Sequence, residues 1–123
     1  MNKLLWIFVG GGLGSIARYY LGKWFNGADL LMPYGTFSAN VLGSFFIGFL
    51  TGIFISRHWI NTQWAPAILI GFLGGFTTFS TFTFESLHFI RQGQWESFLA
   101  YFFSSLIIGL FSVAFGFYLS RFV

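Results

Sequence analysis

The chain has 123 residues, of which 56% are hydrophobic and only 7% are charged, whereas soluble domains are about a quarter charged. Its net charge is +3, but the six basic residues are scattered singly, which argues against a nucleic-acid partner. The absence of cysteine excludes disulfides, and the separated His58 and His88 argue against a zinc site. The composition predicts an all-α membrane protein in which residues 1–123 form a single integral domain.

The first predicted span covers residues 4–21 and is rich in glycine. Gly10 and Gly14 form a GxxxG pair, which favours close packing against another helix. Arg18 interrupts the apolar run, and two interpretations stay open: its side chain snorkels to the interface, or it faces an aqueous vestibule. Lys3 before an apolar run is also found in signal peptides, but there is no small-residue cleavage site and three further hydrophobic segments follow.

Residues 23–33 contain Asn26, Gly27, Asp29 and Pro33 and are predicted to form a loop. The second predicted span, residues 35–56, carries Asn40 near its start. Gly43 follows three residues later and therefore lies on the same helix face. The amide is interpreted either as an interhelical hydrogen-bonding group or, beside the small glycine, as a contact for a ligand.

The third predicted span covers residues 65–90, begins beside Pro66, and contains the run GFLGGFTTFSTFTFE at residues 71–85. Gly74 and Gly75 weaken a helix, and five Ser and Thr residues bring hydroxyl groups to membrane depth. Irregular backbone at that depth requires protein or a water-filled cavity to satisfy its polar groups. This run is therefore predicted to face an ion, a pore or a partner chain. The fourth predicted span covers residues 97–119.

Four spans place both termini on one side of the membrane, and the basic residues then divide evenly. Three flank the side of the termini and three flank the other side: Lys3, Arg57 and Arg121 against Arg18, Lys23 and Arg91. Since orientation follows an excess of Lys and Arg on one side, this chain is predicted to insert both ways. A chain with both orientations can reproduce an inverted repeat by pairing with an inverted copy. We therefore expect an antiparallel homodimer.

The chemistry of the spans favours an anion. Asn40, the Tyr101 phenol and several Ser and Thr hydroxyls offer hydrogen-bond donors, whereas Glu85 is the only carboxylate in a predicted span. The positive edge of a phenylalanine ring also suits an anion. Phenylalanines recur every three residues at positions 76, 79 and 82, which is compatible with a line of ring edges or with the general abundance of Phe in this chain.

Three motifs carry a resemblance to a known family: GGGLGSIARY at residues 10–19, GTFSANVLG at 35–43 and GFLGGFTTFSTF at 71–82. Over nearly its whole length the chain resembles the Fluc, or CrcB, family of small bacterial fluoride channels. The resemblance implies four transmembrane helices with a broken third helix, two pores in an antiparallel homodimer, and passive export of fluoride across the bacterial inner membrane. A second, inverted copy and the lipid bilayer are its expected partners.

The resemblance also implies roles for individual residues. Gly74 and Thr77 match positions whose backbone carbonyls hold a structural sodium ion at the dimer centre. The residues that match the fluoride path are Asn40, Phe79 and Phe82, with Thr36, Ser80 and Thr81 beside them and a hydroxyl row formed by Tyr101 and Ser105. Arg18 and Glu85 match a vestibule arginine and a carboxylate after the phenylalanine motif. The chain departs from the pattern at Gly109, where the row has no further hydroxyl.

The main alternative is a proton-coupled transporter of the small multidrug type, which also has four short spans and dual topology. Its chemistry needs a carboxylate at the centre of the first span, and residues 4–21 contain none. An enzyme is not expected, because no nucleophile, base and orienting group are arranged to cooperate.

Overall fold

The structure, a computed structural model, describes residues 3–26 and 32–123, and within them every regular element is helical. The elements in chain order are α1 (Lys3–Phe25), α2 (Tyr34–Ser56), the π-helix η1 (Pro66–Phe72), α3 (Leu73–Phe76), α4 (Phe79–Arg91), α5 (Trp95–Leu119) and the 3₁₀ turn η2 (Ser120–Phe122). The predicted all-α class is confirmed.

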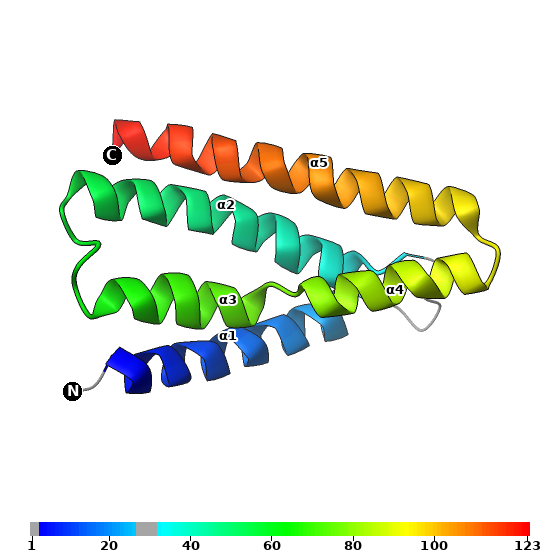
Figure 1. Cartoon of the computed structure of the whole chain (residues 1–123), viewed down its shortest axis with the longest axis horizontal. Coiled ribbons are helices and arrows are strands. Elements are labelled where there is room, and N and C mark those ends of the chain that lie inside the picture. The colour runs from blue at the N-terminus through cyan, green and yellow to red at the C-terminus, as the bar shows by residue number, and fades with distance from the viewer. Residues whose placement is uncertain (1–2, 27–31) are drawn as a thin grey trace.

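Four long segments lie side by side, and the third of them consists of η1, α3 and α4 in succession (Figure 1). Each of the four is long and apolar enough to cross a membrane. Both termini lie at the same end of the molecule as the connection from α2 to η1, as an even number of spans requires (Figure 1). The chain is therefore built as a multi-pass membrane protein.

The first connection starts later than the sequence predicted. Helix α1 continues to Phe25, so Lys23 and Trp24 belong to its last turn, and the prediction that the loop begins at residue 23 was wrong. A lysine near a helix C-terminus is favoured by the helix dipole, and the backbone N–H of Asn26 still donates to the Gly22 carbonyl at 2.8 Å. The predicted turn residues Gly27 and Asp29 lie outside the described residues. The other span boundaries agree with the prediction to within three residues.

Glycines set the contact between α1 and the first half of the third segment. A Cβ atom at Gly10 would overlap the Ala67 carbonyl oxygen, and one at Gly14 would overlap the Phe72 carbonyl oxygen. From the opposite side, a Cβ at Gly75 would overlap the Gly11 carbonyl. The GxxxG pair of the first span thus serves packing within the chain, where two backbones touch without intervening side chains.

The pair α2 and α5 packs in the same way. A Cβ atom at Gly48 would overlap the Val113 carbonyl oxygen, and one at Gly116 would overlap the Phe45 carbonyl oxygen. The end of the molecule around α4 is packed by side chains instead of glycine contacts. There Phe82, Phe89 and Tyr101 form a buried aromatic core between α4 and α5.

Candidate functional site

The third segment leaves the helical conformation at two residues between α3 and α4. Thr77 (φ −82°, ψ 158°) and Thr78 (φ −151°, ψ 116°) are extended, while Phe76 ends one helix and Phe79 begins the next. The Thr77 N–H closes α3 by donating to the Leu73 carbonyl at 3.0 Å. The Thr78 hydroxyl oxygen caps α4 by accepting from the Thr81 N–H at 3.2 Å. Two extended residues capped on both sides therefore lie at the middle of a membrane-length segment.

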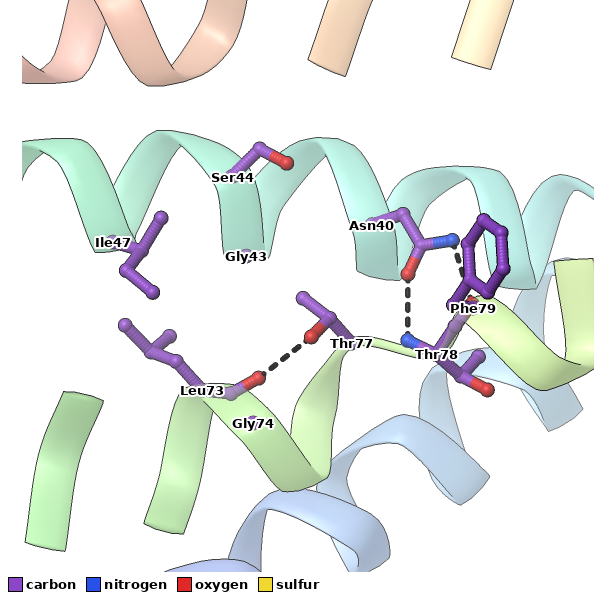
Figure 2. Close-up of a pocket in the computed structure, with 9 residues that line it drawn as sticks. All are labelled: Asn40, Gly43, Ser44, Ile47, Leu73, Gly74, Thr77, Thr78 and Phe79. Carbon is purple, nitrogen blue, oxygen red and sulfur yellow. Dashed lines mark hydrogen bonds between the residues drawn. The ribbon is translucent and has the colours of Figure 1, made fainter. Parts of the chain in front are cut away.

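Asn40 of α2 holds this extended stretch with both ends of its amide. Its Oδ1 accepts from the Thr78 N–H at 2.7 Å, and its Nδ2 donates to the Thr78 carbonyl at 3.0 Å (Figure 2). The interhelical interpretation of Asn40 is thus confirmed. Its contact with fluoride remains a prediction.

Gly43, the small residue beside Asn40, is in contact with the break. The methyl group of Thr77 lies against Gly43, where a Cβ atom would overlap it, and the Thr77 hydroxyl donates to the Leu73 carbonyl at 2.9 Å. Asn40 and Gly43 also line one cavity, so the space predicted beside the amide is present, and its use by a ligand remains a prediction. At Gly74, by contrast, no atom of the described residues beyond its own helical turn lies within 4 Å of the place a Cβ would take.

An open cavity of about 280 Å³ lies along this side of the break (Figure 2). It is lined by polar groups of the break and by side chains of α2 and α3: Asn40, Gly43, Ser44, Ile47, Leu73, Gly74, Thr77, Thr78 and Phe79. The cavity brings together four residues that the sequence had singled out, namely Asn40, Gly74, Thr77 and Phe79. Three of these belong to a single run of six residues, and Asn40 reaches them from another helix.

The two phenylalanines predicted to line a path differ sharply in their surroundings. Phe79 is 74% exposed, whereas Phe82 is 2% exposed and packs against Tyr101 and Phe102. Their ring centroids lie 5.9 Å apart. Phe76, the third member of the series, stacks on Phe72 on the other side of the break, with the ring planes 8° from parallel. Phe79 and Phe82 are thus direct neighbours, and only Phe79 presents an open face.

A second, larger cavity of about 630 Å³ opens where α1, α2 and α4 meet. Its lining mixes cationic, anionic and hydroxyl side chains: Ser15, Arg18, Tyr19, Gly22, Lys23, Asn26, Gly35, Thr36, Thr78, Thr81 and Glu85. Arg18 belongs to this wall and donates to the Thr77 carbonyl at 3.4 Å. Of the two interpretations of Arg18, the structure supports the one in which the guanidinium faces a hollow rather than snorkelling away from the chain.

Glu85 lies between this cavity and the aromatic core. Its carboxylate accepts from the Thr36 hydroxyl at 2.8 Å and from the Tyr101 hydroxyl at 2.7 Å. The three residues come from α2, α4 and α5, so the carboxylate ties three helices together at one end of the bundle. This arrangement gives the predicted carboxylate a defined set of partners.

The predicted hydroxyl row of Tyr101 and Ser105 is only partly assembled. Tyr101 is 1% exposed and bonds Glu85, whereas the buried Ser105 Oγ has no hydrogen-bond partner among the residues that the structure describes. It is Ser104 that shares a small cavity of about 110 Å³ with Tyr101. Ser80 contacts the Thr78 hydroxyl at 3.3 Å and so belongs to the capping group of α4.

Sequence reasoning counted Thr78 among the hydroxyl residues of the run but gave it no role of its own in the site. Thr78 is 6% exposed and bonds Asn40 twice through its backbone, while its side chain caps α4 and donates to the Thr81 hydroxyl at 3.0 Å. The spacing of Thr78 and Thr81 is that of an N-cap and its third residue, which was the available signal. Ser15 and Asn26, likewise given no role in the site, line the larger cavity without a comparable pattern in the sequence.

The site contains no cluster of three or more His, Cys, Asp or Glu side chains in the described ranges 3–26 and 32–123. Its candidates for a cation are backbone carbonyls. The Thr78 N–H, which would bond the Gly74 carbonyl in a continuous helix, donates to Asn40 instead. The break therefore releases the Gly74 carbonyl oxygen from its usual helical partner, next to the extended Thr77. Two carbonyl oxygens of this kind suit a hard monovalent cation.

Comparison with known proteins places the chain in a family. Residues 5–117 match the family model described as CrcB-like protein, Camphor Resistance (CrcB). A protein of Acidobacterium capsulatum named fluoride-specific ion channel FluC is 41% identical, covering 93% of this chain and 92% of its own. Proteins of the same name from Phocaeicola vulgatus and Nitratidesulfovibrio vulgaris are 40% and 43% identical, covering 98% and 89% of this chain and 100% and 90% of their own. The resemblance seen in the three motifs is thus confirmed, and the chain belongs to the CrcB-like family.

Proposed function

We propose that this protein is a fluoride-selective ion channel that exports fluoride passively across the bacterial inner membrane and so limits its toxicity in the cell. The observation that carries the proposal is the match over almost the whole chain to relatives named fluoride-specific ion channels. A channel is a non-enzymatic role. The proton-coupled alternative finds no support, because the family is a different one and α1 contains no carboxylate.

We place the fluoride path along the residues that lie around the break and the larger cavity. Asn40 and Phe79 line the cavity at the break, and Phe82 adjoins Phe79. Thr36, Thr81, Ser80, Tyr101 and Ser105 supply hydroxyl groups on the neighbouring helices. Arg18 and Lys23 place positive charge in the wall of the larger cavity, which would raise the local concentration of an anion entering there. In this scheme that cavity is the vestibule and the open face of Phe79 lies further along the path.

The functional unit in this proposal is an antiparallel homodimer with two pores. The three basic residues near one end of the bundle equal the three near the other, so neither orientation is favoured. The open Gly74 face and the exposed Phe79 ring lie together beside the break, where a second, inverted copy would cover them. An inverted copy would also bring a second pair of Gly74 and Thr77 carbonyls to the same place. These four oxygens would hold a structural sodium ion, which would supply positive charge beside the anion path.

Fluoride efflux from liposomes that contain only this purified chain tests the channel directly. We expect rapid fluoride efflux with little chloride efflux. Replacement of Phe79 by Ile should suppress fluoride efflux while the chain still folds, because the exposed ring contributes little to packing within the chain. Phe84→Ile is the matched control, since Phe84 lies on the same helix and is 71% exposed but is not part of the proposed path. Equal fluoride and chloride fluxes from the native chain would refute the proposal.

Complementary lysine substitutions test the inverted dimer. The connection from α2 to η1 lies at the end that carries the termini, and the connection from α4 to α5 lies at the opposite end (Figure 1). The first connection contains the exposed Asn61 and Gln63, and the second contains the exposed Gln92 and Gln94. Lysine at both members of either pair should fix one orientation and abolish efflux when that variant is the only copy present. Co-expression of the two oppositely biased variants should restore efflux. Full activity of either variant alone would contradict the antiparallel arrangement.

A further inference from the structure

The peptide group that joins Thr77 to Thr78 belongs to neither helix of the third segment. The Thr77 N–H closes α3 on the Leu73 carbonyl, and the Thr78 side chain caps α4. Between these two caps, the Thr77 carbonyl and the Thr78 N–H are left without helical partners. At membrane depth such groups need partners from elsewhere in the protein.

Both ends of this one peptide group are held by side chains from other helices. Arg18 of α1 donates its Nη1 proton to the Thr77 carbonyl at 3.4 Å, and the Thr78 N–H donates to Asn40 Oδ1 of α2 at 2.7 Å. Because a peptide group is planar, contacts at its carbonyl and at its N–H together fix its rotation about the chain axis. Side chains of α1 and α2 thus hold the two ends of this peptide group by hydrogen bonds.

The hydrogen bond of Arg18 is notable for the partner it uses. Arg18 and Glu85 line the same cavity, yet the guanidinium donates to a backbone carbonyl. The Glu85 carboxylate accepts instead from the hydroxyls of Thr36 and Tyr101. Arg18 therefore bonds the break rather than the carboxylate of Glu85.

The other degrees of freedom of Thr77 are already restricted. Its hydroxyl donates to the Leu73 carbonyl at 2.9 Å, and its methyl group occupies the face of Gly43. The side chain therefore cannot turn without losing the hydrogen bond or meeting α2. What these contacts leave unfixed is the direction of the Thr77 carbonyl, which is the group that Arg18 contacts.

We propose that Arg18 is a positioning residue, which clamps the Thr77–Thr78 peptide together with Asn40 and fixes the direction of the Thr77 carbonyl oxygen. A carbonyl oxygen has two lone pairs, so it can accept from Arg18 and still bind a cation. The consequence for sodium rests on the proposed function. Without the guanidinium, Asn40 alone holds this peptide group, so the Thr77 carbonyl is less firmly oriented as a ligand and the structural sodium site should weaken.

Amide hydrogen exchange at Thr78, followed by NMR in threonine-labelled protein, tests the clamp itself. In Arg18→Met, exchange at Thr78 should be about tenfold faster or more, because the peptide opens more readily. Arg18→Lys, which keeps a charged donor of similar length, should restore most of the protection. Lys23→Met is the control, since Lys23 lines the same cavity from the same helix and should leave Thr78 exchange unchanged. Native exchange at Thr78 in the Met variant would overturn the clamp, and Arg18→Gln serves if that variant does not fold.

The sodium dependence of fluoride efflux tests the consequence for the cation site. Arg18→Met should need a higher sodium concentration for half-maximal efflux, and Arg18→Lys should return it toward the native value. If Arg18 acted only by attracting fluoride, the sodium dependence would stay native while the fluoride dependence shifted, and that result would overturn the positioning role toward sodium. Failure of the native chain to conduct fluoride would refute the proposed function, whereas the exchange experiment would still decide on the clamp.

Discussion

The glycine-packed helix pairs and the break in the third segment differ in what their backbones contact. Along α1 with η1 and α2 with α5, backbones touch because glycines remove the side chains between them, as at Gly14 and Gly48. At the break, the backbone leaves the helix, the side chains of Arg18 and Asn40 reach it from other helices, and the Thr78 side chain caps α4. Packing of the helix pairs therefore requires residues without a side chain, whereas the break requires particular hydrogen-bond donors and acceptors. The two regions should fail in different ways when they are mutated.

The largest effect is expected where a single methyl group enters a backbone contact. Gly14→Ala places a Cβ against the Phe72 carbonyl, so α1 must move away from the third segment. Overpacking costs about 1–3 kcal/mol, and we expect the upper end because neither backbone can turn aside. The measurement is the temperature at which the purified protein loses its monodisperse peak in size-exclusion chromatography.

Gly12→Ala is the control for this prediction. Among residues 3–26 and 32–123, a Cβ at Gly12 meets no atom within 4 Å outside its own helical turn, so the substitution should be neutral or stabilise the helix by up to about 1 kcal/mol. Gly48→Ala and Gly109→Ala form the corresponding pair for α2 and α5, since a Cβ at Gly109 makes only an ordinary contact, 3.7 Å from Ser44 Oγ. Equal melting temperatures within each pair would contradict the steric account of the glycine-packed regions.

A smaller loss of stability is expected when the break loses its amide. Asn40→Ala removes both hydrogen bonds to the Thr78 backbone and introduces no clash. A buried group left unsatisfied costs about 1–3 kcal/mol, so the fold should survive while fluoride efflux falls strongly. Thermal stability and liposome efflux measure the two effects.

Asn26→Ala provides the matched control for Asn40→Ala. Asn26 Oδ1 accepts one hydrogen bond, from the Gly35 N–H at 2.8 Å, in the wall of the larger cavity. Loss of one such bond should cost about 0.5–1.5 kcal/mol. If the two alanine variants were equally stable and equally active, the special dependence of the break on Asn40 would be refuted.

The same contrast explains what could be predicted from the sequence. The spans and the glycine contacts follow from composition and short spacings, because hydrophobic length and small residues act locally. The irregular run around Gly74 and Thr77 was also visible, since glycines and hydroxyls are unfavourable in a lipid-facing helix. The hydrogen-bond partners of this run could not be predicted, because the bond from Asn40 to Thr78 joins residues 38 positions apart.

Two further features lay beyond sequence reasoning for the same reason. The π-helical turns of η1, where the Leu73 N–H donates to the Ile68 carbonyl, have no local pattern that separates them from an α-helix. The contact between the Thr77 methyl group and Gly43 has no local signal in the sequence either. Both features depend on the register in which the helices pack, and that register cannot be read directly from a single sequence.

The smallest effect is expected at the edge of the network, where Tyr101 donates to Glu85. Tyr101→Phe keeps the ring that packs against Phe82 and Phe89 and removes only the hydroxyl. The expected loss is about 1 kcal/mol, because the Thr36 hydroxyl still donates to the same carboxylate. Ser104→Ala is the control. Its hydroxyl bonds its own helix at the Tyr101 carbonyl, so its effect should stay within about 0.5 kcal/mol.

A double-mutant cycle with Thr36→Val sharpens this last prediction. If Thr36 and Tyr101 share Glu85, the carboxylate keeps one partner in each single variant and loses both in the double variant. The double variant should then be less stable than the sum of the single effects by about 0.5 kcal/mol or more. Simple additivity would mean that the two hydroxyls act independently. In that case Glu85 would not couple α2, α4 and α5 energetically, and the stabilising hydrogen bonds of this region would be those of the break at Thr77 and Thr78 alone.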